Sequence, residues 1–218
     1  IHMRAWQEMF NEELSRHQGQ NPYTGEDYFA YVDGKPRYDG VRDFLASRGI
    51  TLPEGDPSDG PAAQTICGLG NRKNDLFNTL LARDGIQPYP GSRRWVDRLH
   101  ESGMAMAVVS SSRNAAAVLK AAGMAEDFSV LVDGNRSKAE RLPGKPAPDT
   151  YLRGAELLGV PAEECVVVED AVSGVRAGAA GGFGMVLGVN RGVGADRLRE
   201  AGADRVVDDL DEMVEEMA

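Results

Sequence analysis

The sequence contains few cysteines, and they form no recognisable motif. Its two cysteines, Cys67 and Cys165, lie far apart and match no metal-ligand spacing. Such a pair is typical of reduced thiols in a cytoplasmic protein, where disulfides are rare. We therefore expect a cytoplasmic protein with neither a disulfide framework nor a cysteine-bound metal.

Long hydrophobic runs and a signal peptide are also absent. No stretch approaches the ~20 apolar residues that a membrane-spanning helix needs, and the first residues lack a basic segment followed by an apolar run. Apolar residues from Met3 to Leu14 instead recur at helical spacing, which predicts an amphipathic helix at the start of the chain. One alternative stays open, namely that His2 and Met3 are a remnant of cloning.

Basic residues are outnumbered by acidic ones. The 218 residues include 24 Lys and Arg against 34 Asp and Glu, which gives a formal net charge of −10. Nucleic acids and anionic membranes usually bind to a basic protein face, so neither is expected as a partner. A chain of this charge that binds phosphorylated metabolites must gather its few cations locally.

Several catalytic motifs are missing as well. The sequence has no Walker-type lysine loop, no nucleophile-elbow serine and no zinc-binding helix. Gly182-Phe183-Gly184 resembles the start of a dinucleotide fingerprint, but it precedes a strand-like run instead of following one. The sequence therefore points away from these enzyme classes.

Two regions of different character follow one another along the chain. Residues 1–88 carry few β-rich runs, and we predict a small, mostly helical domain there. From residues 89 to 218, apolar strand-like runs alternate with helical patterns, which indicates an α/β domain with a parallel sheet covered on both faces. The helices expected in the first region span residues 2–17, 39–48, 61–68 and 71–83. The strands expected in the second span residues 104–109, 128–132, 165–168, 185–189 and 205–207, with helices at 114–122, 149–158 and 173–180.

Polar residues stand where two of the expected strands end. Ser110 directly follows an apolar run, and Ser111 and Ser112 continue into the turn that opens a helix. Hydroxyl and backbone N–H groups converge at such a turn and suit an anion such as phosphate. Plain helix capping by the serines is the alternative interpretation.

A lysine and a pair of carboxylates complete the pattern. Lys145 lies between a glycine and a proline, whose restricted backbone would aim its ammonium, although a solvated turn lysine is the alternative. Glu169 and Asp170 follow an apolar strand, where buried carboxylates need a counter-charge that Mg²⁺ can supply. An ordinary acidic loop is the other interpretation of this pair. Because ligands collect at the carboxyl ends of parallel strands, the ordered set predicts phosphoryl transfer assisted by Mg²⁺.

These segments resemble the haloacid dehalogenase superfamily of phosphotransferases, and within it the β-phosphoglucomutase-like branch. Ser110 matches the second family motif, Lys145 in Gly-Lys-Pro-Ala-Pro-Asp the third, and Glu169-Asp170 the fourth. The resemblance implies a Rossmann-like core with an inserted helical cap, Ser110 and Lys145 as catalytic residues, and Mg²⁺ on Asp170. Glu169 would bind the metal directly or support the site from behind.

The resemblance also implies residues that bind the substrate. His2 and Lys73 would be cap residues that contact the sugar or close the site, and Arg37 would hold the second phosphate. From the core side, the same phosphate would be contacted by Ser112, Arg113 and Asn114. The implied partner is a small phosphorylated sugar, and we expect a monomer.

One family motif has no match in the 218 residues. The superfamily's Asp-x-Asp, whose first aspartate is the nucleophile, would be expected upstream of Ile1, and the chain without it is expected to be inactive. Three interpretations follow: a β-phosphoglucomutase-type isomerase acting through an aspartyl-phosphate, a sugar-phosphate phosphatase, or a non-catalytic sugar-phosphate-binding module. A mutase grips a bisphosphorylated intermediate at both ends, so the two implied phosphate subsites favour the isomerase.

Overall fold

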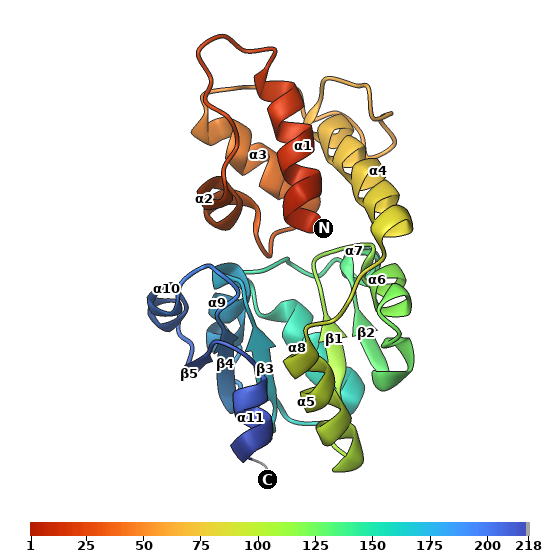
Figure 1. The fold of residues 1–218 in the computed structure, drawn as a ribbon, viewed down its shortest axis with the longest axis vertical. Helices are drawn as coiled ribbons and strands as arrows, with labels where there is room; N and C mark the ends of the chain where they lie inside the picture. The colour runs from red at the N-terminus through yellow and green to blue at the C-terminus, as the bar shows by residue number, and fades with distance from the viewer. Residues whose placement is uncertain (217–218) are drawn as a thin grey trace. The chain divides into compact units, whose positions relative to one another are not determined.

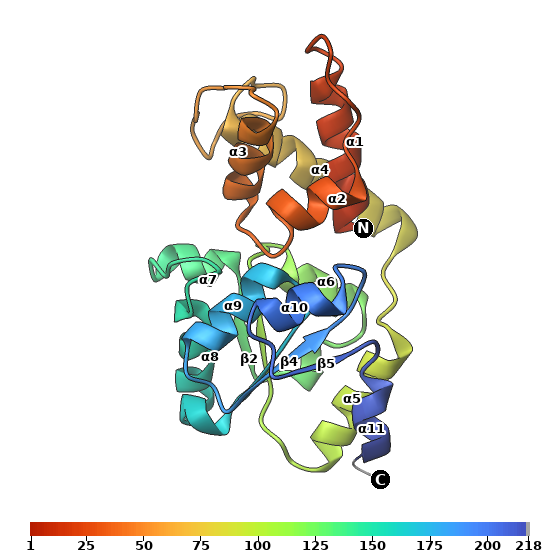
Figure 2. The same ribbon diagram turned by 90° about the vertical axis from the view of Figure 1, so that its left-hand side faces the viewer.

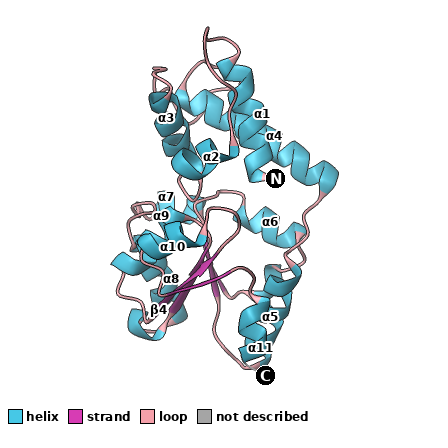
Figure 3. Ribbon diagram, turned by 60° about the vertical axis from the view of Figure 1, so that its left-hand side comes forward, coloured by secondary structure: helices cyan, strands magenta, loops and turns pink. Residues whose placement is uncertain are grey.

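A computed structural model describes residues 1–216, and the chain divides into two compact units. Unit 1 spans Ile1–Ile86 and unit 2 spans Gln87–Ala218. The regular structure of unit 1, all of whose residues are described, is helical (Figure 3). Its elements are α1 (His2–Leu14), α2 (Gly25–Asp27), a π-helix (Tyr28–Val32), α3 (Arg37–Ser47) and α4 (Ile66–Asp84).

The core of unit 1 is built from apolar side chains at helical spacing. Helix α1 buries one face, on which Phe10 packs against Phe44 of α3 with the ring centroids 4.2 Å apart. Leu69 of α4 is also fully buried in this cluster. Burying side chains of this size removes about 1.5–3 kcal/mol of unfavourable hydration each, so the three helices depend on one another.

Helix α4 departs from the sequence-based prediction. Separate helices over residues 61–68 and 71–83 were wrong, because one helix runs from Ile66 to Asp84. Two glycines inside it mark close packing instead of a helix end. A Cβ on Gly68 would overlap the carbonyl oxygen of Ala63, and one on Gly70 would lie 2.7 Å from the ring of Tyr38.

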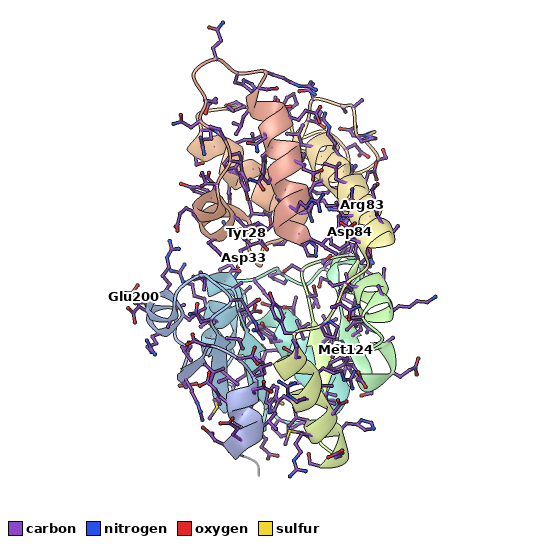
Figure 4. All side chains as sticks on the ribbon, viewed as in Figure 1. Tyr28, Asp33, Arg83, Asp84, Met124 and Glu200 are labelled. Atoms are coloured by element: carbon purple, nitrogen blue, oxygen red, sulfur yellow. The ribbon has the colours of Figure 1, made fainter. Side chains whose placement is uncertain are left out.

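The first turn of α4 is capped by a side chain, and Gly85 follows its last residue with a positive φ of 64°. The hydroxyl of Thr65 accepts a hydrogen bond from the N–H of Gly68 at 2.9 Å and so caps the first turn. Thr65 also donates to Asp59 at 2.6 Å. At the other end, Arg83 and Asp84 lie side by side (Figure 4), with Arg83 Nε 2.6 Å from Asp84 Oδ1.

Unit 2 alternates strands and helices, and its strands pair in parallel, which confirms the predicted α/β class. The chain enters it through α5 (Pro90–Glu101), and none of the helices in residues 1–216 is long and apolar enough to cross a membrane. The strands are β1 (Ala107–Val109), β2 (Val130–Val132), β3 (Val166–Glu169), β4 (Met185–Val189) and β5 (Arg205–Val207). The later helices are α6 (Ala115–Ala121), α7 (Gly134–Ala139), α8 (Asp149–Leu158), α9 (Val172–Ala180), α10 (Ala195–Glu200) and α11 (Asp211–Glu216).

The strands form two sheets where the sequence predicted one. β1 pairs with β2, with Val109 opposite Val132, and a separate sheet has the order β3-β4-β5. Within residues 1–216 no ladder joins β1 to β3: β1 pairs with β2 alone, and β3 pairs with β4 alone. The carboxyl ends of β1 and β3 still carry Ser110 and Glu169, as predicted.

Helices cover the strands through small residues. Gly154 of α8 lies against β1, since a Cβ there would be 3.1 Å from Val109, and Gly178 of α9 lies equally close to Val167 and Val186. Helices α5 and α11 lie side by side (Figures 1 and 2), with Arg94 Nε 2.7 Å from Asp211 Oδ1. These contacts hold the strand ends in place for the polar loops that follow them.

Loss of the α4 cap should weaken unit 1. We expect Thr65→Ala to lower the free energy of unfolding by about 1–2 kcal/mol, because the N–H of Gly68 loses its partner and the Asp59 carboxylate loses one of its donors. Urea unfolding followed by circular dichroism measures this change. Thr79→Ala, at an exposed hydroxyl of the same helix, should change it by less than about 0.5 kcal/mol. Equal effects of the two substitutions would contradict the capping role.

Candidate functional site

Serine hydroxyls organise the turn that follows β1. Ser110 continues the strand, because its N–H donates to the carbonyl of Val132 at 2.9 Å. Its Oγ accepts from the N–H of Ser112, and Ser112 Oγ accepts from the N–H of Asn114, both at 3.1 Å. Each hydroxyl keeps its own proton, which it can donate to an anionic oxygen. The capping and anion-binding interpretations of this loop are therefore compatible.

The start of α7 packs against the loop of residues 110–114. A Cβ on Gly134 would lie 2.7 Å from the carbonyl oxygen of Ser111, so only glycine allows this close approach. Asn135 Nδ2 donates to the carbonyl of Arg113 at 2.9 Å. Buried Asp133 accepts hydrogen bonds from the first N–H groups of α7 and fixes that helix. The sequence analysis missed Asp133 and Gly134, which sit after the second strand and carry no family motif.

Lys145 and Glu169 form a buried ion pair. Lys145 Nζ lies 2.5 Å from Glu169 Oε2, and the two side chains are 5% and 10% exposed. The other oxygen, Oε1, accepts from the N–H groups of Asp170 at 3.1 Å and Ala171 at 3.0 Å. Burial acts to raise the pKa of Glu169, but the Lys145 ammonium and these hydrogen bonds outweigh it and hold the pKa well below its ordinary value. The predicted fixed ammonium thus exists, and a carboxylate fixes it.

The carboxylates at the end of β3 suit a magnesium ion that also binds water and a substrate phosphate. Mg²⁺ commonly binds one or two carboxylates and completes its shell with water and substrate phosphate. Asp170 is exposed at the carboxyl end of β3, directly after Glu169. In the described part of the chain, no three His, Cys, Asp or Glu side chains cluster in a way that could hold a metal. The donor set therefore suits Mg²⁺ shared with a phosphate and does not suit a closed structural metal site.

Unit 1 gathers cations around an aromatic cluster. Lys73 is only 5% exposed, and its Nζ lies 2.8 Å from His2 Nδ1 and 4.8 Å from the centre of the Trp6 ring. Phe77 stacks on the His2 ring at 4.3 Å and lies 5.1 Å from the same Nζ. An ammonium that donates to Nδ1 leaves the proton of neutral histidine on Nε2.

The charges in this cluster change one another's pKa. Burial, assisted by the positive charge of Arg37, lowers the pKa of Lys73 to about 7. Burial and the Lys73 charge lower the pKa of His2 to about 3. Arg37 donates to Asn74 Oδ1 at 2.7 Å, and so is held beside the pair. The structure therefore brings together the three predicted substrate-binding residues of unit 1, although α1, α3 and α4 each supply one of them.

The chain is similar to several known proteins. The family model for haloacid dehalogenase-like hydrolases matches residues 1–182. A β-phosphoglucomutase of Mycobacterium tuberculosis (strain CDC 1551 / Oshkosh) is 47% identical over 98% of this chain and 85% of its own length. Hexitol phosphatase A of Escherichia coli is 32% identical over 96% of this chain and 84% of its own length. In fold, the chain is similar to a crystal structure of β-phosphoglucomutase from Clostridium difficile, with a TM-score of 0.77 at 20% identity, covering 99% of this chain and 88% of that one.

The depressed pKa of Lys73 should make stability depend on pH. The folded amine loses its proton near pH 7, whereas an unfolded lysine does so near 10.4. Between these values the unfolded chain binds more protons, so stability rises with pH. Relative to Lys73→Met, the wild type should therefore gain about 2 kcal/mol between pH 7 and pH 9.

Urea unfolding at the two pH values measures this gain. Lys120→Met, at an exposed lysine of α6, is the matched control. The opposite outcome is a difference in the free energy of unfolding between wild type and Lys73→Met that stays constant from pH 7 to pH 9. Such a result would show that the pKa of Lys73 is not lowered in the folded protein.

Proposed function

The chain belongs to the haloacid dehalogenase-like hydrolase family, and we propose that it is a β-phosphoglucomutase. This enzyme interconverts β-glucose 1-phosphate and glucose 6-phosphate. The observation that carries the proposal is the 47% identity to a β-phosphoglucomutase over nearly the whole chain. The grouping of cationic residues in both units supports it.

In unit 2, Lys145 and Ser110 would stabilise the phosphoryl group in transfer. Phosphoryl transfer is accelerated chiefly by positioning and by charge that meets the phosphoryl oxygens. The hydroxyl of Ser110 offers a proton, and the Lys145 ammonium still has donors beyond the one that Glu169 accepts. Both groups are fixed before substrate arrives, so little reorganisation is needed.

Magnesium would bind at Asp170, with Glu169 as a direct ligand or as support from behind. When bound, Mg²⁺ supplies positive charge at the phosphoryl oxygens. The exposed carboxylate of Asp170 directly after β3 supports this placement.

In unit 1, Arg37, Lys73 and His2 would bind the second phosphate and the sugar. In unit 2, Ser112, Arg113 and Asn114 are the phosphate-binding residues that the family resemblance implies. A mutase must hold a bisphosphorylated intermediate while it changes which phosphate reacts, whereas a phosphatase needs only one phosphate grip. Hexitol phosphatase A is the more distant of the two relatives, so the likeness to it does not favour the phosphatase alternative.

The reaction itself tests the proposal. The full-length protein, given β-glucose 1-phosphate, Mg²⁺ and catalytic glucose 1,6-bisphosphate, should form glucose 6-phosphate. A coupled dehydrogenase assay detects this product, and chelation of Mg²⁺ should abolish its formation. Release of free phosphate without glucose 6-phosphate would identify a phosphatase, and the absence of both products would leave the binding-module interpretation.

Arg37 separates the mutase from the phosphatase. Arg37→Ala removes a guanidinium from the phosphate grip, and a lost charged hydrogen bond costs about 1.5–3 kcal/mol. We expect the KM for the bisphosphate to rise by about tenfold or more. Arg83→Ala, which removes an exposed arginine paired with Asp84, should leave the KM unchanged. Equal loss of activity on mono- and bisphosphates in Arg37→Ala would count against the mutase.

A further inference from the structure

A buried tyrosine links the two charged residues of unit 2. Tyr151 lies in the first turn of α8 and is 8% exposed. Its hydroxyl donates to Glu169 Oε2, the oxygen that also faces Lys145. The Lys145 ammonium lies 4.6 Å from the centre of the Tyr151 ring. Three side chains from three segments therefore contact one another pairwise.

Glu169 has no lone pair to spare in this arrangement. A carboxylate accepts about four hydrogen bonds. Oε2 accepts from Lys145 and Tyr151, and Oε1 accepts from the backbone N–H groups of Asp170 and Ala171. To bind a metal directly, Glu169 would have to give up hydrogen bonds that stabilise a buried charge.

The walls around Glu169 also restrict its movement. A Cβ on Gly174 would overlap the Glu169 carboxyl group, so the carboxylate packs directly on the backbone of α9. The Tyr151 ring is held in turn by an edge-on contact with Phe183, with the centroids 6.0 Å apart. The site is therefore built around one orientation of the carboxylate.

We propose that Tyr151 is a positioning residue for phosphoryl transfer, whose hydroxyl holds Glu169 on Lys145 so that Asp170 is the carboxylate that binds Mg²⁺. The inference rests on the proposed function for its kinetic consequence, but its assignment of the two carboxylates does not. Tyr151 acts through Glu169 and Lys145, which aim the ammonium at the phosphoryl oxygens. Glu169 thereby orients Lys145, and Asp170 binds the metal.

Tyr151→Phe isolates the hydroxyl, because the ring and its contacts with Lys145 and Phe183 are retained. A misaimed ammonium should weaken transition-state stabilisation more than ground-state binding. We expect kcat to fall about tenfold, equivalent to ~1.4 kcal/mol, with the KM for β-glucose 1-phosphate within about twofold of wild type. Tyr89→Phe, which removes the hydroxyl of an exposed tyrosine in the same unit, is the matched control and should leave kcat unchanged.

Titration calorimetry with Mg²⁺ alone supplies a readout that is independent of activity. Asp170→Asn should lose Mg²⁺ binding, whereas Glu169→Gln and Tyr151→Phe should keep the dissociation constant within about threefold of wild type. A role of Tyr151 in folding alone would lower the melting temperature without separating kcat from KM.

Several outcomes would overturn the inference. Tyr151→Phe with wild-type kcat would remove the positioning role, and so would a rise in KM as large as the fall in kcat. Loss of Mg²⁺ binding in Glu169→Gln as complete as in Asp170→Asn would make Glu169 a ligand. If the wild type forms no glucose 6-phosphate, the proposed function fails while the calorimetry still decides between the carboxylates. If Tyr151→Phe does not fold, the titrations of Glu169→Gln and Asp170→Asn still show which carboxylate binds Mg²⁺.

Discussion

The ion pair between Lys145 and Glu169 is the interaction on which unit 2 depends. Removing an ammonium or a carboxylate from water costs several kcal/mol, and loss of one partner from a buried pair costs about 3–5 kcal/mol. The surroundings offset this cost, because Tyr151 and two backbone N–H groups complete the shell of Glu169. The packing of α8 and α9 on the strands is thus tied to the placement of one positive charge.

Unit 1 stabilises a buried lysine in a different way. Lys73 has an imidazole and two aromatic rings beside it where Lys145 has a carboxylate. Burial lowers the pKa of Lys73 to about 7, and the positive charge of Arg37 adds to the effect. The rings and the neutral imidazole stabilise an ammonium less than an anion would. The two lysines therefore differ: Lys145 is held by a carboxylate, whereas Lys73 can lose its charge near neutral pH.

Sequence patterns predicted the regular elements better than the contacts between them. The strand at Met185–Val189 and the helix at Asp149–Leu158 were confirmed with the expected bounds, since both have strong periodicity and clear flanking signals. The division of α4 was wrong because glycine marks either a helix end or a close contact, and only tertiary structure separates the two. Tyr151 was missed for a similar reason. A tyrosine on the apolar face of an amphipathic helix is interpreted as a core residue, because the sequence does not show which group its hydroxyl contacts.

The charge balance of the site supports the proposed role of Mg²⁺. Lys145 and Glu169 together carry no net charge, so the pair orients a donor without neutralising a phosphate. In a protein with a net charge of −10, the field of the whole chain also opposes a dianionic substrate. Mg²⁺ on Asp170 would contribute two positive charges for one negative, and so would add positive charge that the Lys145–Glu169 pair does not provide.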